Sequence, residues 1–244
     1  MNIRSIWATG AILALTFGVL ATPARASVIQ TASGGSPGAT VAFTAELTIS
    51  DDLLTIKLRN DSAVASAARD QVLGSYYFDI VRNGSTRPTL TYVSAVGDVW
   101  LTDRNSADVL QTAGANLEAV NAGDNTWQFK TFDAALNPFL GFGISTVGNS
   151  NLAPNNFNGN IVDGVDYSIY TGEVTTQSLN NLRLVKNAAT FTFSGVTGFT
   201  ESDISASFAF GLGTAPDSFI VPEPATLALL SLGGLALLKR RRKS

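Results

Sequence analysis

Residues 40–60, TVAFTAELTISDDLLTIKLRN, carry the clearest strand pattern in the chain. Apolar residues occupy every second position from Val41 to Ile49, and the alternation returns from Leu54 to Leu58. This period of two is typical of strands that bury one face. Because two aspartates form a short polar turn between the runs, the stretch predicts a β-hairpin.

The rest of the body repeats this design in shorter pieces, with Gly, Asn and Asp at the turns. We expect further strands at 76–81, 89–96, 99–101, 126–132, 140–147, 167–170, 182–185, 190–196 and 204–212. Residues 107–120 mix Leu, Ala and Glu and are expected to form the one helix of the body. About ten to twelve short strands favour an all-β fold, an antiparallel two-sheet sandwich of jelly-roll type. No βαβ alternation occurs, so a parallel sheet is not expected.

The first 26 residues have the organisation of a secretory signal peptide. Arg4 supplies a positive charge, residues 6–20 are apolar, and Ala24 and Ala26 form a small-x-small cleavage site. We expect cleavage after Ala26, which leaves Ser27 as the new N-terminus.

The last 24 residues, VPEPATLALLSLGGLALLKRRRKS, combine three features in a fixed order. Pro222, Glu223 and Pro224 form a stiff extended turn that is open to an enzyme. Residues 225–238 lack any charge and are expected to form a single transmembrane helix about 21 Å long, short for a stable span. The stop-transfer run that follows consists of Lys239, Arg240, Arg241, Arg242 and Lys243.

This order of parts resembles the PEP-CTERM sorting signal of Gram-negative bacteria. The resemblance is confined to the tail; an ordinary C-terminal membrane anchor is the alternative. The family implies insertion by the Sec translocon, transient anchoring in the inner membrane, and processing near the Pro-Glu-Pro motif by a membrane enzyme, exosortase. It further implies delivery to the cell surface or extracellular matrix, in association with exopolysaccharide and biofilm.

We therefore expect four segments: a signal peptide at 1–26, a β-sandwich body at 27–214, a linker at 215–220 and the sorting signal at 221–244. The whole chain carries 16 basic and 19 acidic residues, but the body holds only 9 basic residues against 18 acidic ones. Such an acidic body argues against nucleic acid as a partner.

The chain contains no cysteine and no histidine. Ser-His-Asp and Cys-His nucleophile systems and zinc sites built on these residues are therefore excluded. We expect a protein that is not an enzyme and has no cofactor.

Two clusters of oxygen-bearing side chains leave calcium open as an alternative. Their aspartates are Asp98, Asp103, Asp108, Asp163 and Asp166, with Asn105 beside the first three. Carboxylate and amide oxygens suit a hard cation. The same residue types are ordinary in turns of β-proteins, and neither cluster has EF-hand spacing.

Two other functions for the body remain open. As a carbohydrate-binding module of the matrix, it would stack sugars on exposed aromatic rings, for which Trp100, Trp127 and Tyr77 are the candidates. Tyr76 and Tyr77 are adjacent and so point to opposite faces of a strand. As a carbohydrate-active hydrolase, it would need two carboxylates about 5–10 Å apart, and the body glutamates are Glu46, Glu118, Glu173 and Glu201.

An intramolecular crosslink between a lysine and an asparagine requires a buried lysine beside an acid. The body offers Lys57, Lys130 and Lys186. Lys57 lies on the polar face of its expected strand, so the sequence assigns no such bond.

Overall fold

The computed structural model describes residues 26–36, 39–117, 127–132, 141–146, 165–213 and 215–220. These residues form strands and short 3-10 turns, and no α-helix occurs among them. The strands are β1 Val28–Ser36, β2 Ala39–Ser50, β3 Leu53–Asn60, β4 Leu73–Phe78, β5 Thr91–Leu101, β6 Val109–Asn116, β7 Gln128–Thr131, β8 Phe142–Ser145, β9 Ile169–Tyr170, β10 Arg183–Ser194, β11 Ala209–Leu212 and β12 Ala215–Ile220. The 3-10 turns are η1 Arg69–Gln71, η2 Gln177–Leu179 and η3 Glu201–Asp203.

The predicted hairpin is confirmed as β2 and β3. The two strands pair antiparallel, with Leu47 opposite Ile56 and Ser50 opposite Leu53. Asp51 adopts a positive φ of 56° in the turn, a conformation that aspartate tolerates better than most residues. The apolar positions of both strands are buried, as the period of two requires.

Hydrogen bonds link all twelve strands into one large mixed sheet. Its main path runs β1-β2-β3-β10-β9-β4-β11-β12, while β5 and β6 branch from β10 and β8 and β7 branch from β4. Short β9 joins two halves of the sheet, one containing β1, β2, β3 and β10 and the other containing β4, β11 and β12. It pairs parallel with β10 and antiparallel with β4. The all-β prediction is confirmed, whereas a sandwich of two separate antiparallel sheets and a jelly-roll order are not.

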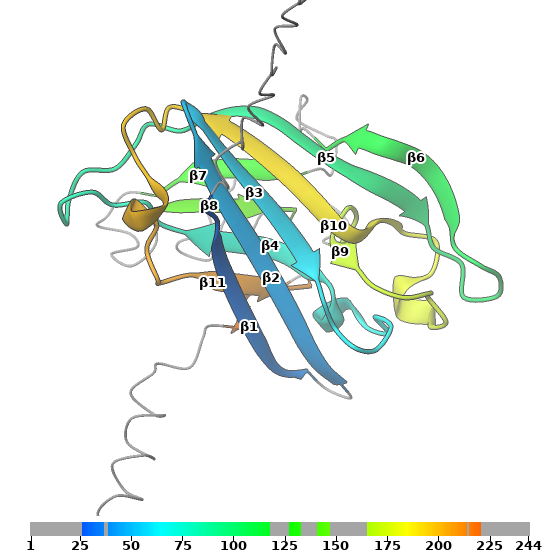
Figure 1. The fold of residues 1–244 in the computed structure, drawn as a ribbon. Coiled ribbons are helices and arrows are strands. Elements are labelled where there is room, and N and C mark those ends of the chain that lie inside the picture. Colours follow the sequence, from blue (N-terminus) through cyan, green and yellow to red (C-terminus); the bar gives the residue numbers. More distant parts are fainter. Residues whose placement is uncertain are drawn as a thin grey trace, which may run out of the picture.

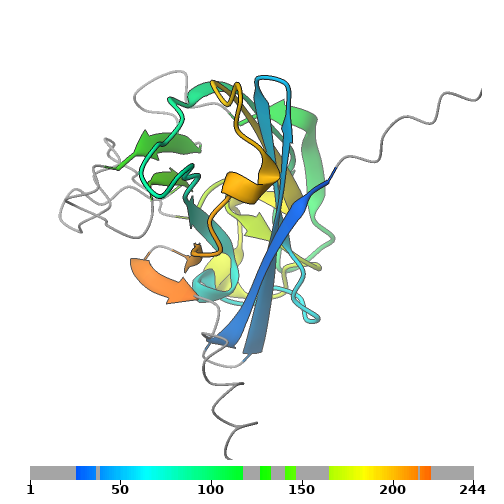
Figure 2. The ribbon, with the colours of Figure 1, turned by 60° about the vertical axis from the view of Figure 1, so that its left-hand side comes forward.

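The sheet places β4, β7, β8 and β11 behind the long strands β1, β2, β3 and β10 (Figure 1). The view in Figure 2 shows these shorter strands to one side of the long ones. Aromatic rings bridge the two halves: Phe43 of β2 lies 5.8 Å from Phe210 of β11, and Phe129 of β7 lies 4.6 Å from Phe193 of β10. The buried apolar core therefore lies between the two halves.

The helix expected at 107–120 is wrong for its described part, because residues 109–116 form β6. This strand pairs antiparallel with β5, with Leu110 opposite Trp100 and Asn116 opposite Val96. Gly114 takes a positive φ of 58° there, and nearly all of β6 is exposed. The backbone hydrogen bonds offered by β5 outweigh the high intrinsic helix propensity of Ala, Leu and Gln.

Other boundaries also differ from expectation. The expected strands at 89–96 and 99–101 belong to the single strand β5, and the strand expected at 204–212 is confined to β11. Strand β1 was not foreseen, since its sequence VIQTASGGS is rich in small residues. The expected strands at 182–185 and 190–196 belong to the single strand β10, which bends between them. Where a linker was expected at 215–220, the backbone forms β12 and pairs with β11.

Most of the two targeting segments, 1–25 and 221–244, lies outside the described residues. Within the described part of the chain, no helix has the length and apolar character needed to cross a membrane.

Candidate functional site

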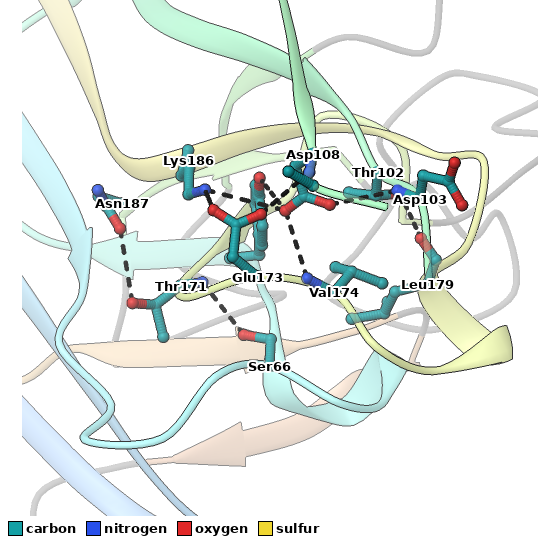
Figure 3. Close-up of polar contacts among 12 residues, drawn as sticks. Ser66, Thr102, Asp103, Asp108, Thr171, Glu173, Val174, Leu179, Lys186 and Asn187 are labelled. Atoms are coloured by element: carbon teal, nitrogen blue, oxygen red, sulfur yellow. Dashed lines mark hydrogen bonds and ion pairs between the residues drawn. The ribbon is translucent and has the colours of Figure 1, made fainter. Parts of the chain in front are cut away.

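Five side chains from four separate segments meet at one end of β10. We call them the Lys186 cluster: Lys186 of β10, Asp108 just before β6, Glu173 in the loop after β9, Tyr170 of β9 and Trp100 of β5. Figure 3 shows three of them, Lys186, Asp108 and Glu173. In the sequence analysis, Asp108 is considered for calcium and Trp100 for sugar stacking. Glu173 is considered there for hydrolysis and Lys186 for a crosslink.

A β-bulge places Lys186 in the cluster. Val185 pairs with Val99 and Ala189 with Gly97, so residues 186–188 of β10 face only Asp98 of β5. Such bulges bend a strand and redirect its side chains. The next residue, Asn187, has a positive φ of 67°, which marks the bend.

Two aromatic rings lie beside the Lys186 ammonium. The Lys186 ammonium lies 4.5 Å from the centre of the Trp100 ring and 5.6 Å from that of Tyr170. Tyr170 is also the parallel cross-strand neighbour of Lys186. The rings attract the cation through their negative faces and leave the side chain only 15% exposed.

The carboxylate of Asp108 is fully buried. The Tyr170 hydroxyl donates to its Oδ2 at 2.9 Å and the Val174 amide at 3.3 Å. The Asp103 amide donates to Oδ1 at 3.2 Å. The Lys186 Nζ lies 3.9 Å from Oδ2. These donors supply the polar partners that a buried carboxylate requires.

Glu173 closes the cluster on the solvent side. Its Oε1 accepts a hydrogen bond from Lys186 Nζ, and its Oε2 accepts one from the Asp108 backbone amide at 3.0 Å. The bond from Lys186 holds the pKa of Glu173 below its ordinary value, with a smaller contribution from the Asp108 amide. Neighbouring Gly172 has a φ of 77° and packs against Ala65, where a Cβ would overlap that residue.

The cluster thus encloses one cation between two carboxylates in an apolar setting. Burial raises the pKa of the Tyr170 hydroxyl, and its bond to Asp108 raises it further, so this hydroxyl keeps its proton and acts as a donor. The arrangement places an amine, a buried carboxyl and a second, partly exposed carboxyl within contact distance.

Three of the described calcium candidates accept hydrogen bonds from different backbone and side-chain groups. Asp98 accepts from the Gly114 amide at 2.8 Å, and Asp103 accepts from the Asn105 amide and the Ser106 hydroxyl. The Asn105 amide, and next the Ser106 hydroxyl, lower the pKa of Asp103. Asp163 lies outside the described residues, whereas Asp166 is described. Among the described residues, no group of three His, Cys, Asp or Glu side chains could hold a metal ion.

The sugar-stacking candidates lie mostly inside the protein. Tyr77 is fully buried against Phe132 and Ala209, because β4 is covered on both faces. Trp127 is buried against Phe191 and donates to the Tyr167 carbonyl at 2.8 Å. Trp100 lies partly buried beneath Lys186. The sequence pattern did not reveal that both faces of β4 are covered.

The body glutamates serve different local contacts. Glu201 accepts from the Ile49 amide at 3.1 Å, and Glu46 stands opposite Lys57 in the β2–β3 hairpin. Glu173 belongs to the Lys186 cluster, and Glu118 lies outside the described residues.

The sorting motif Pro222, Glu223 and Pro224, the basic run at 239–243 and Ala24 also lie outside the described residues, while Ala26 is exposed just before β1. Residues 221–243 match the family described as the PEP-CTERM protein-sorting motif. No curated protein and no solved structure matches the chain. The chain therefore carries a PEP-CTERM sorting motif in its C-terminal tail, which supports export and processing by an exosortase-type membrane enzyme.

Proposed function

We propose that this chain is a non-enzymatic protein of the cell surface or extracellular matrix, where it associates with exopolysaccharide in a biofilm. The observation that carries the proposal is the PEP-CTERM match at residues 221–243. In this proposal the Sec translocon exports the chain, its signal peptide is removed after Ala26, and residues 225–238 anchor it in the inner membrane. The basic run at 239–243 then holds the C-terminus in the cytoplasm until exosortase processes the chain near Glu223.

The position of the last strand supports this order of events. Strand β12 ends at Ile220 and the matched motif begins at residue 221. A cut within the Pro-Glu-Pro segment therefore removes no strand from the sheet. The body can leave the membrane with all twelve strands in place.

The non-enzymatic part of the proposal is based on composition. Without histidine and cysteine, the chain lacks the side chains that activate nucleophiles in most hydrolases. Sugar stacking on Tyr77 or Trp127 is not part of the proposal, because both rings fill the core.

Replacement of Glu223 with Ala in the native producer tests the sorting step. We expect the variant to stay in the membrane at full length, because the processing enzyme no longer recognises the turn. Thr226→Ala, three residues further along the same tail, is the matched control and should be released normally. An unchanged yield of the Glu223→Ala protein at the cell surface would refute the proposal.

A further inference from the structure

We propose that Lys186 and Asp108 join through an intramolecular amide bond between Nζ and Cγ, with Glu173 carrying the proton between them. The Lys186 Nζ already lies 3.9 Å from Asp108 Oδ2 and is hydrogen-bonded to Glu173 (Figure 3). The inference concerns a covalent modification of the body and does not depend on the sorting of the chain.

The fold holds the amine close to its target. The bulge in β10 directs Lys186 into the cluster, and the rings of Trp100 and Tyr170 lie beside its ammonium. Rotation about the side-chain bonds of Lys186 brings Nζ to the Asp108 carbon. Fixing two groups side by side in this way raises their effective concentration by several orders of magnitude.

The partners of Asp108 suit an acyl group under attack. The Tyr170 hydroxyl at 2.9 Å and the Val174 amide at 3.3 Å both donate to Oδ2. Negative charge develops on this oxygen as the carbon becomes tetrahedral, and donors that are already in place stabilise it. Oδ1 accepts from the Asp103 amide at 3.2 Å and is the oxygen that leaves.

The reaction balances without any further reagent. Glu173 takes a proton from the Lys186 ammonium, and the free amine attacks Asp108 Cγ to form the Nζ–Cγ bond. The Cγ–Oδ1 bond then breaks. Oδ1 leaves as water with two of the three ammonium protons, one of them delivered by Glu173, which returns to its carboxylate. No atom changes oxidation state.

Burial favours the amide over the ion pair. The Asp108 carboxylate is fully buried and the Lys186 side chain is 15% exposed, so both charges have lost most of their hydration. Amide formation removes both charges and expels one water molecule. The partly exposed Glu173 remains to connect the cluster with solvent, into which the water can escape.

Lys57 is a lysine of the same chain that faces a carboxylate in an exposed setting. It is exposed on β3 and stands opposite Glu46 in the hairpin. This pair lacks the aromatic cover and the buried acceptor of the Lys186 cluster. Lys57 is therefore the internal control.

The test is mass spectrometry of the protein purified from producing cells. We expect each recovered form of the wild-type protein to be lighter by one water molecule than the mass calculated from its own first to its last residue. The Lys186→Arg and Asp108→Ala variants should show the full calculated masses. Trypsin should release a branched species in which residues 105–130 are joined to the peptide that contains Lys186. Lys57→Arg should keep the mass deficit.

Glu173→Gln tests the proton carrier, since it keeps the shape of the side chain and leaves both reacting groups in place. We expect this variant to fold, as judged by circular dichroism, and to retain the full mass. Linear tryptic peptides ending at Lys186 from folded wild-type protein would overturn the bond. The wild-type digest shows whether the bond forms even where a variant fails to fold. Equal crosslinking in Glu173→Gln and wild type would overturn the role of Glu173 as proton carrier.

Discussion

Asp79 lies buried beside the end of β4 and receives two hydrogen bonds from Arg87, at 2.8 and 2.7 Å. Arg87→Ala would leave this carboxylate without its cation. We expect the free energy of unfolding to fall by about 3 kcal/mol, the usual cost of an unpaired buried charge. Urea denaturation followed by tryptophan fluorescence measures the loss.

Arg59→Ala is the matched control for Arg87→Ala. Arg59 pairs with Asp61 at 3.4 Å where both side chains are substantially exposed. Such a pair contributes less than about 1 kcal/mol. Equal losses in the two variants would contradict the account of Asp79 as a buried, paired charge.

Asp52 ties the β2–β3 turn to the end of β10. Its Oδ1 accepts from the amides of Gly195 at 3.1 Å and Thr197 at 3.0 Å, and from the Thr197 hydroxyl. That hydroxyl bond is the largest cause that lowers the pKa of Asp52 below its ordinary value of 3.8. Because the folded pKa is depressed, the contribution to stability is complete above 3.8 and is lost as the pH falls through the folded pKa.

Asp52→Asn should therefore be less stable than wild type at neutral pH, and the difference should shrink in acid. Urea denaturation at a series of pH values measures it, and Asp51→Asn controls for loss of a charge in the same turn. A stability difference that stays constant across the acid range would be incompatible with the lowered pKa.

The residues of the Lys186 cluster illustrate the limit of sequence reasoning at this scale. Asp108 was recognised as an oxygen-bearing residue, but its partners Glu173 and Lys186 are far away in the chain. No local pattern joins them. Their meeting depends on the β10 bulge and on the parallel pairing of β9, and neither feature was visible in the sequence.

Two glycines with positive φ allow the cost of backbone strain to be compared with the cost of steric crowding. Gly195 follows β10 with a φ of 99°, and a Cβ there would overlap the Thr89 carbonyl oxygen. Gly84 has a φ of 77° in a turn with open space around it. Alanine at Gly195 should lower the free energy of unfolding by about 3 kcal/mol, whereas alanine at Gly84 should cost about 1 kcal/mol. Thermal and urea unfolding of both variants compare the losses, and a Gly84→Ala loss as large as that of Gly195→Ala would argue against the close approach of β10 to Thr89.

Strands could be predicted from the sequence where apolar and polar residues alternate and a polar turn separates two such runs. The β2–β3 hairpin meets both conditions, so its extent was predicted closely. In β6 the sequence VLQTAGAN has no such alternation, and its strand conformation depends on hydrogen bonds from β5. Strand β1 is likewise defined by its pairing with β2 rather than by its own small residues.

At the scale of the whole molecule, the last strand ends at residue 220 and the sorting motif begins at residue 221. A chain that ends at Val221 keeps β12 and should unfold with the same free energy as the full body. A chain that ends at Gly213 loses β12 and exposes the edge of β11, so it should be less stable and more prone to aggregate. Urea denaturation and light scattering compare the two, and equal stability would mean that β12 adds nothing to the sheet.

The most direct test of the central claim is the intact mass of the protein recovered from culture medium and from washed membranes of producing cells. We predict a released form that begins at Ser27 and ends between Val221 and Pro224. That result would establish both processing events. If every recovered form instead retained Leu238 and the basic run at 239–243, the chain would be a permanently anchored protein and the sorting account would be contradicted.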